Sequence, residues 1–213
     1  MPTLLRLDSS ADSRSSRSRE VTDAFAAAWT ARGPGYEVVH RDLVAEPVPH
    51  VTDSALHWAK DLRQPGEQPD SAAEAAQREI LDEIDRADVL LIGAPLYNYT
   101  VPSTLKAWID QIHVLGVTAP FGDKETQPYK GKEAVIVASQ GLSYDDGPQQ
   151  GLDHGVPVLQ EILGRALGME LTVLYSRYTL ASRVPQLADF KPKAEAEHAN
   201  ALQQARELAA TLS

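Results

Sequence analysis

Short apolar runs recur along the chain, and the segments between them carry apolar residues three or four positions apart. The runs predict strands, and the spacing between them predicts helices. The five expected strands are Thr3–Leu7, Tyr36–His40, Val89–Gly93, Ala134–Ser139 and Leu171–Tyr175. Three of these strands are almost wholly apolar, which is typical of strands that are covered on both faces of a sheet.

Helices are expected in every gap between these strands and after the last one. They run from about residue 18 to the Gly33-Pro34-Gly35 stop, from 72 to 86, from Pro102 to about Leu115, from about 158 to Gly168, and from about 192 to 212. Pro102 suits the first turn of a helix, and Thr100 is available as its cap.

Strands that alternate with helices are joined by crossover connections and therefore run parallel. The pattern predicts an α/β fold with a doubly wound, five-stranded parallel sheet covered on both faces. The flavodoxin-like strand order 2-1-3-4-5 fits such a chain best. We expect a single domain over residues 1–213. An irregular excursion at about 43–71 contains several prolines and a possible short helix at 52–62.

Composition limits the chemistry that this fold can perform. The 213 residues include no cysteine, so disulfides, thiolate metal sites and cysteine nucleophiles are excluded, and redox chemistry requires a cofactor. A formal charge of −10 disfavours general binding to nucleic acid or to a membrane surface. No apolar run is long enough to cross a bilayer and no leader pattern is present, which predicts a cytoplasmic protein. The six histidines lack ligand-like spacing, so no metal site is expected, and no G-x-S-x-G motif suggests a hydrolase.

Three loops carry the candidate chemistry, because the predicted order gathers the carboxyl ends of strands one, three and four at one crevice. The first loop, residues 8–19, offers serine hydroxyls and N–H groups at a helix start, which suit a phosphate; it lacks both common nucleotide-loop motifs. The loop at 96–99 adds two tyrosines, and the loop at 139–148 adds a glycine. Each loop alone has a plainer interpretation, as a capped turn or as packing aromatics. Their convergence favours one flat ligand that bears a phosphate.

These loops resemble those of the FMN-dependent NADH-azoreductases, a family of flavodoxin-like reductases of quinones and azo compounds. The resemblance covers nearly the whole chain and rests on Leu7-Asp8-Ser9-Ser10, Ser16-Arg17-Ser18, Pro95-Leu96-Tyr97-Asn98-Tyr99, Gly116-Val117-Thr118, Ser139-Gln140-Gly141 and Asp146-Gly147-Pro148. It implies a tightly but non-covalently bound FMN, with NADH or NADPH as the electron donor. It also implies a homodimer that transfers two electrons as hydride, by a ping-pong mechanism, to a quinone or an aromatic azo compound.

The resemblance also assigns roles to residues. The FMN phosphate would be held by Ser10, Ser16, Arg17 and Ser18, the isoalloxazine by Leu96, Tyr97, Asn98 and Tyr99, and its pyrimidine side by Ser139, Gln140, Gly141 and Leu142. Asn98, which would orient the ring, and Tyr144, near the substrate, are the candidate catalytic residues. Phe121 is the candidate for a ring that covers the substrate.

The chain departs from the family pattern at two places in its last loop. Gln140 and Leu142 stand in a segment that usually reads Ser-Arg-Gly-Gly, and Tyr144 stands where a histidine is common. These departures bear on the choice of substrate and electron donor.

Two other functions remain open on the sequence. A flavodoxin-type electron carrier would hold FMN and pass single electrons to a protein partner, and the acidic charge suits one. A non-catalytic regulator would sense flavin or NADH with little turnover. The match to the reductase loops extends over more of the chain and favours an enzyme that acts on small molecules, without nucleic acid, membrane or metal.

Overall fold

A five-stranded parallel sheet forms the centre of the molecule in the computed structural model, which describes residues 1–212. Its strands are β1 (Thr3–Asp8), β2 (Glu37–Asp42), β3 (Val89–Pro95), β4 (Glu133–Ser139) and β5 (Glu170–Ser176). Their order is β2-β1-β3-β4-β5, and every neighbouring pair is parallel. The predicted fold class and strand order are confirmed, and the predicted strands differ from the observed ones only at their ends.

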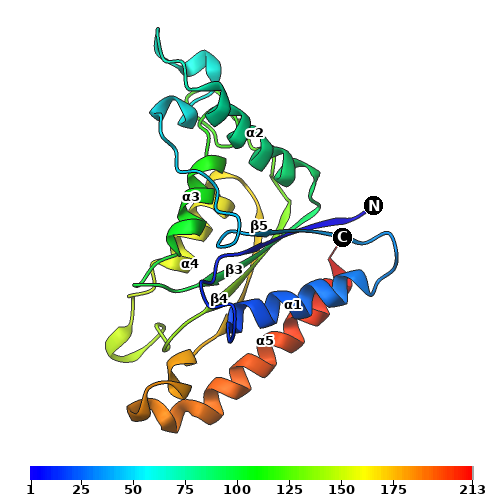
Figure 1. Cartoon of the computed structure of the whole chain (residues 1–213), viewed down its shortest axis with the longest axis vertical. Coiled ribbons are helices and arrows are strands. Elements are labelled where there is room, and N and C mark those ends of the chain that lie inside the picture. The colour runs from blue at the N-terminus through cyan, green and yellow to red at the C-terminus, as the bar shows by residue number, and fades with distance from the viewer. Residues whose placement is uncertain (213) are drawn as a thin grey trace.

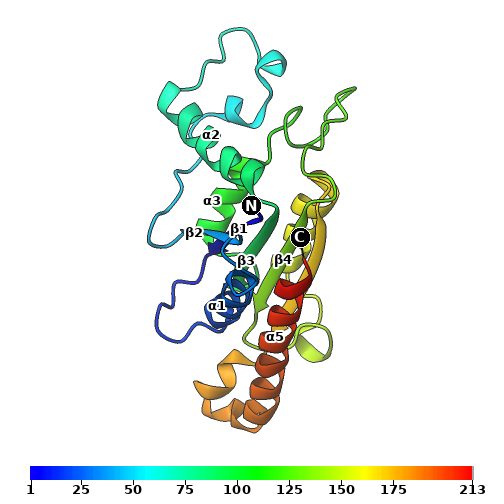
Figure 2. The ribbon, with the colours of Figure 1, turned by 90° about the vertical axis from the view of Figure 1, so that its right-hand side faces the viewer.

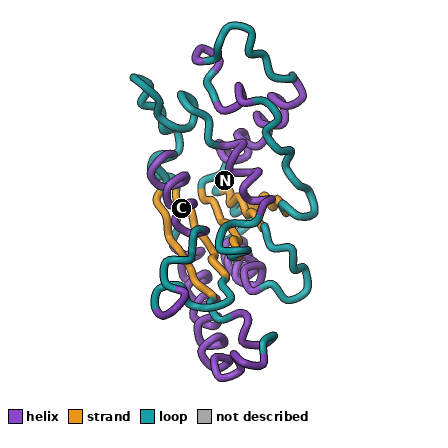
Figure 3. Tube along the Cα trace, turned by 90° about the vertical axis from the view of Figure 1, so that its left-hand side faces the viewer, coloured by secondary structure: helices purple, strands orange, loops and turns teal. Residues whose placement is uncertain are grey.

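Helices cover both faces of this sheet (Figure 1, Figure 2). One face carries α1 (Arg17–Thr30) and α5 (Lys191–Thr211), which also pack against each other. The other face carries α2 (Ser71–Arg86), α3 (Ser103–Ile112) and α4 (Gly155–Leu159). A π-helical segment, Gln160–Ala166, continues α4. The excursion between β2 and α2 is mostly loop (Figure 3) and lies at the top of Figure 1, beyond the sheet.

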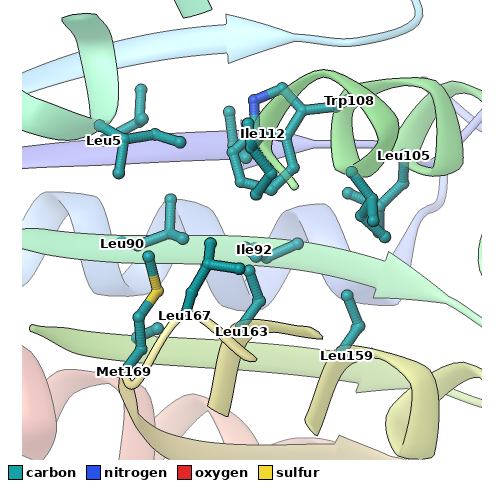
Figure 4. Packing of buried hydrophobic residues seen from close by; sticks show 14 of the residues in the cluster. Leu5, Leu90, Ile92, Leu105, Trp108, Ile112, Leu159, Leu163, Leu167 and Met169 are labelled. Atoms are coloured by element: carbon teal, nitrogen blue, oxygen red, sulfur yellow. The ribbon is translucent and has the colours of Figure 1, made fainter. Parts of the chain in front are cut away.

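Two apolar clusters hold the helices to the sheet. Under α3 and α4, Trp108 and Ile112 are fully buried against strand residues such as Leu90 (Figure 4), so α3 packs into the core of its own chain. Under α1 and α5, Phe25 and Trp29 meet three fully buried alanines of α5, Ala201, Ala205 and Ala209. Each such large side chain contributes roughly 1.5–3 kcal/mol when it is fully buried. Because successive residues of β3 face alternate clusters, its sequence has no polar side.

Two local predictions were wrong. Pro102 occupies the cap position of α3, and because proline has no side-chain acceptor, no side chain caps that helix. Thr100 lies two residues before this position, in a turn with Tyr97. The expected helix at 52–62 consists of two short 3-10 turns, Ser54–His57 and Lys60–Leu62. In addition, α3 ends before Leu115, where the Thr118 hydroxyl donates to the Ile112 carbonyl at 2.6 Å.

Candidate functional site

The loops after β1, β3 and β4 lie at one edge of the sheet and are bonded to one another. Ser9 donates to the Gly93 carbonyl from both its N–H (3.2 Å) and its hydroxyl (2.6 Å). The Leu96 N–H donates to the Ser139 carbonyl at 2.8 Å. These bonds join the three predicted loops into one continuous surface at the carboxyl ends of the strands.

The first loop presents hydroxyl and N–H groups at the start of α1. Ser16 caps the helix, since its Oγ accepts from the Arg19 N–H at 3.3 Å and lies 3.1 Å from the Ser18 Oγ. Ser10, Ser16 and Ser18 are all buried. The first N–H groups of a helix lack partners within it, and the helix dipole favours a negative charge there. This end of the site therefore suits an anion such as a phosphate.

Arg17 takes part in this end of the site through its backbone rather than its charge. Its guanidinium points to α5, where it pairs with Glu195 at 2.5 Å, and it also lies 3.6 Å from Glu20. Within residues 1–212, the Arg17 N–H has no hydrogen-bond acceptor. That N–H is free to meet a ligand, whereas the side chain is already neutralised by two carboxylates.

The loop after β3 is a tight turn with two consecutive residues in the left-handed conformation. Tyr97 and Thr100 exchange backbone hydrogen bonds of 2.8 and 3.0 Å, and the residues between them, Asn98 and Tyr99, have φ angles of 49° and 68°. Asparagine tolerates this conformation, but it is costly for a bulky residue such as tyrosine. The turn leaves both side chains exposed at the edge of the sheet.

The Tyr97 side chain connects this turn to the first loop. Its hydroxyl accepts from the Ala11 N–H at 3.1 Å and lies 3.3 Å from the Ser10 Oγ. These contacts join the turn after β3 to the hydroxyl-rich first loop.

The fourth loop contains an unpaired buried acceptor. Gln140 is 2% exposed, and its Nε2 donates to Asp153 Oδ2 at 2.8 Å. Because only the amide nitrogen can donate to a carboxylate, Oε1 is the atom left over. In the part of the chain that the structure describes, Oε1 has no hydrogen-bond partner. A buried acceptor without a donor costs free energy, so this atom suits a ligand that brings an N–H or O–H.

Gly141 lies in close contact with Leu180. A Cβ at this position would lie 2.8 Å from the Leu180 Cδ1, on the connection that follows β5, where the Leu180 N–H also donates to the Gly141 carbonyl at 3.3 Å. Leu180 remains 39% exposed beside the loop. The sequence analysis missed this residue, since a single leucine after a strand carries no local signal apart from its place at the carboxyl end of β5.

Tyr144 faces the turn after β3. Its ring meets the ring of Tyr99 edge-on, with centroids 6.5 Å apart, and both Tyr144 and Leu142 are half-buried. Burial raises the pKa of the Tyr144 hydroxyl above its usual value, and Tyr99 and Asp153 add to the shift. The hydroxyl therefore remains protonated at neutral pH and is available as a donor.

Phe121 lies apart from these loops. It packs edge-on against Trp58 of the excursion, with ring centroids 5.0 Å apart, and is 43% exposed. The excursion is at the top of Figure 1, whereas the loop after β4 is at the lower left. The structure thus brings together the residues of the three loops and leaves Phe121 outside them.

Neither a metal site nor a membrane-spanning helix is found among residues 1–212. No group of three or more His, Asp or Glu side chains is arranged to hold a metal ion. None of the helices described combines the length and the apolar character that a bilayer crossing requires.

The chain matches known proteins over almost its full length. A family model described as a flavodoxin-like fold matches residues 2–208. The FMN-dependent NADH:quinone oxidoreductase of Kineococcus radiotolerans is 52% identical over 100% of both chains. The enzyme of the same name from Streptomyces coelicolor is 41% identical over 100% of this chain and 98% of its own.

Solved structures share the fold at lower identity. An azoreductase from Bacillus anthracis has a TM-score of 0.79 and 22% identity, with 99% of each chain covered. An FMN-dependent NADH-azoreductase from the same species, solved in complex with FMN, has a TM-score of 0.77 and 19% identity, with 98% of this chain and 100% of that chain covered.

Proposed function

Because this chain belongs to the family of flavodoxin-like FMN-dependent NADH:quinone oxidoreductases, we propose that it reduces quinones with electrons from NADH. The observation that carries the proposal is the bonded junction of three loops, which offers an anion site at one end and an exposed aromatic turn at the other. Bound FMN would supply the hydride-accepting and two-electron-donating chemistry of this reaction. Aromatic azo compounds are the second proposed class of acceptor, and a ping-pong order is part of the proposal.

The phosphate end fits FMN through neutral donors. The hydroxyls of Ser10, Ser16 and Ser18 and the backbone N–H of Arg17 would hold the phosphate at the start of α1. The Arg17 guanidinium, which already pairs with Glu195, would contribute through α5 rather than by direct contact.

The ring end fits the isoalloxazine through the turn after β3 and the loop after β4. Leu96, Tyr97, Asn98 and Tyr99 would lie along the ring, with Asn98 orienting it, and Ser139, Gln140, Gly141 and Leu142 would meet its pyrimidine side. The unpaired Gln140 Oε1 calls for a donor, and the oxidised isoalloxazine has one N–H group, at N3. Backbone N–H groups near Gly141 would stabilise the negative charge that develops on the pyrimidine side on reduction.

Tyr144 would act on the acceptor. Its protonated hydroxyl, beside the exposed ring of Tyr99, would donate a hydrogen bond to a quinone oxygen as negative charge develops there. A quinone is flat and apolar, and the exposed side chains of Tyr99 and Leu180 offer it an apolar surface.

We also propose that the protein works in the cytoplasm as a homodimer of single-domain chains. Phe121 supports the dimer, because it is exposed and stands outside the three loops of its own chain. Its ring would cover a substrate only in the site of a partner. Sedimentation of the purified protein as a monomer at micromolar concentration would contradict this part of the proposal.

Anaerobic mixing of the FMN-loaded protein with NADH tests the proposed reaction. A reductase bleaches rapidly and then turns over many times when a soluble quinone is added. An electron carrier does not bleach with NADH, and a regulator bleaches or binds without repeated turnover. A parallel run with NADPH establishes which donor is preferred. A protein that takes up no FMN would overturn the site assignment as well as the reaction.

A further inference from the structure

Arg19 connects the first loop to the end of β2. Its Nε and Nη2 donate to the Ser10 carbonyl at 3.2 and 2.8 Å, and its Nη1 and Nη2 donate to the two carboxylate oxygens of Asp42 at 2.7 and 2.9 Å. The side chain is only 17% exposed. The planar guanidinium thus holds a backbone carbonyl and a carboxylate at the same time, which a lysine cannot do with the same geometry.

The direction of the Ser10 carbonyl matters for an anion site. A carbonyl oxygen is the negative end of the peptide dipole and repels a phosphate when it points toward one. The Ser10 carbonyl is turned toward Arg19, and the next N–H, that of Ala11, meets the Tyr97 hydroxyl at 3.1 Å. The loop is left with hydroxyl and N–H groups for the ligand.

Arg19 is itself firmly anchored. Asp42 ends β2, and its Oδ1 also accepts from the Val44 N–H at 3.0 Å. The hydrogen bonds from Arg19 are the main reason that the pKa of Asp42 falls to about 2, so this carboxylate stays charged at neutral pH. The fully buried Asp8, which accepts from Arg6 at 2.8 Å, lies 4.0 Å from the Arg19 guanidinium.

We propose that Arg19 is a positioning residue for the FMN phosphate. By donating to both the Ser10 carbonyl and the Asp42 carboxylate, it keeps the first loop in its binding conformation before FMN arrives. Such preorganisation raises affinity because the ordering of the loop is not paid at binding. This inference rests on the proposed use of FMN and adds a residue that does not touch it.

The test compares Arg19→Gln with a matched control, Arg41→Gln. Arg41 stands next to Asp42 on β2, is 14% exposed and makes a similar ion pair, with Glu83 and Glu79 of α2, but it does not contact the first loop. Both variants lose a partly buried ion pair, but only Arg19→Gln also loses the hydrogen bonds to the Ser10 carbonyl. Apoprotein is titrated with FMN and, separately, with riboflavin, which lacks the phosphate, by quenching of flavin fluorescence, and its unfolding in urea is followed.

We expect Arg19→Gln to weaken FMN binding by about tenfold or more, as expected for the loss of charge-assisted hydrogen bonds, and to leave riboflavin affinity within about twofold. Both variants should lower the urea midpoint of unfolding by similar amounts, but Arg41→Gln should leave FMN affinity unchanged. Equal loss of FMN affinity in the two variants, or equal loss of FMN and riboflavin affinity in Arg19→Gln, would overturn the inference.

Two further variants separate positioning from direct charge and guard against misfolding. Arg19→Lys keeps the charge but cannot hold both acceptors, so it should bind FMN weakly; full recovery would mean that the charge acts on the phosphate directly, and the positioning role would be wrong. If Arg19→Gln does not fold, Asp42→Asn removes the charge and one of the two acceptor oxygens that anchor Arg19, and it should weaken FMN binding by a smaller factor. Unchanged affinity there contradicts the inference. Failure of the unaltered apoprotein to bind FMN would overturn the proposed function itself, whereas the other outcomes concern Arg19 alone.

Discussion

The two ends of the candidate site are built in opposite ways. At the phosphate end, Asp8, Arg19 and Asp42 are covered and tied to one another and to the backbone. At the ring end, the turn after β3 holds Tyr99 in a left-handed conformation and leaves it 50% exposed. One end is rigid and polar, and the other stores backbone strain beside an open apolar surface. The difference suits an enzyme that binds one part of its cofactor permanently and must admit changing substrates at the other.

Gly93→Ala should damage the phosphate end most. A Cβ there would lie 2.8 Å from Asp8 Oδ1 and 3.4 Å from Thr22 Cγ2, so the buried carboxylate would be displaced from its partners. We expect a loss of about 2–4 kcal/mol in the free energy of unfolding, measured in urea on the apoprotein. Gly35→Ala, where no atom lies within 4 Å of the added Cβ, is the control and should change stability by less than about 0.5 kcal/mol. A similar small change for Gly93→Ala would mean that the phosphate end is more pliable than its bonding indicates.

Tyr144→Phe probes the ring end alone. Loss of the hydroxyl should lower the turnover of a quinone by about tenfold, because a hydrogen bond to the developing charge is lost, while FMN affinity stays within about twofold. Stopped-flow kinetics of the quinone step and an FMN titration provide both values. A variant that loses its FMN instead would place Tyr144 in cofactor binding, and the assigned catalytic role would be wrong.

Tyr97→Phe cuts the connection between the two ends. Its hydroxyl bonds to the Ala11 N–H and approaches Ser10, so its removal should cost about 1 kcal/mol and weaken FMN binding by about fivefold. Tyr99→Phe is the matched control, since no hydrogen bond of the Tyr99 hydroxyl is found within the described residues. Equal FMN affinities of the two variants, measured by fluorescence titration, would show that the ends act independently.

The smallest expected effect is the pH dependence of the phosphate end. Arg19 lowers the pKa of Asp42 from 3.8 to about 2, so the pair stabilises the folded state above the unfolded pKa and loses this effect as the pH falls from about 4 toward 2. The difference in unfolding free energy between the unaltered protein and Asp42→Asn should therefore be constant from pH 7 to pH 5 and shrink below about pH 4. A difference that already shrinks between pH 7 and pH 5 would indicate that another group titrates.

The sheet could be predicted because its evidence is local. In β3, Val89 and Leu91 face one apolar cluster and Leu90 and Ile92 face the other. A run of consecutive apolar residues therefore already indicates that both faces of the strand are buried. The start of α1 could also be predicted: it was expected at about residue 18, and the helix begins at Arg17 with Ser16 as its cap.

The features that escaped prediction depend on distant parts of the chain. The turn of Asn98 and Tyr99 lacks the glycine that usually marks such turns, and its place is fixed by the bond from Leu96 to Ser139. The contact of Leu180 with Gly141 spans about forty residues. The side chain of Arg17 pairs with Glu195 near the other end of the chain, a contact that no sequence pattern reveals. Helix spacing and loop composition are insensitive to such contacts.

The packing of α1 on α5 also has a consequence for biosynthesis. The helix α1 carries Phe25 and Trp29, and the residues that cover them, Ala201 and Ala205 of α5, are synthesised much later. Until then the nascent chain exposes an apolar face of the kind that chaperones and proteases recognise. The phosphate loop leads into the same helix, and the packing of α1 is complete only once α5 lies against it. FMN is therefore expected to be loaded only after α5 has been synthesised.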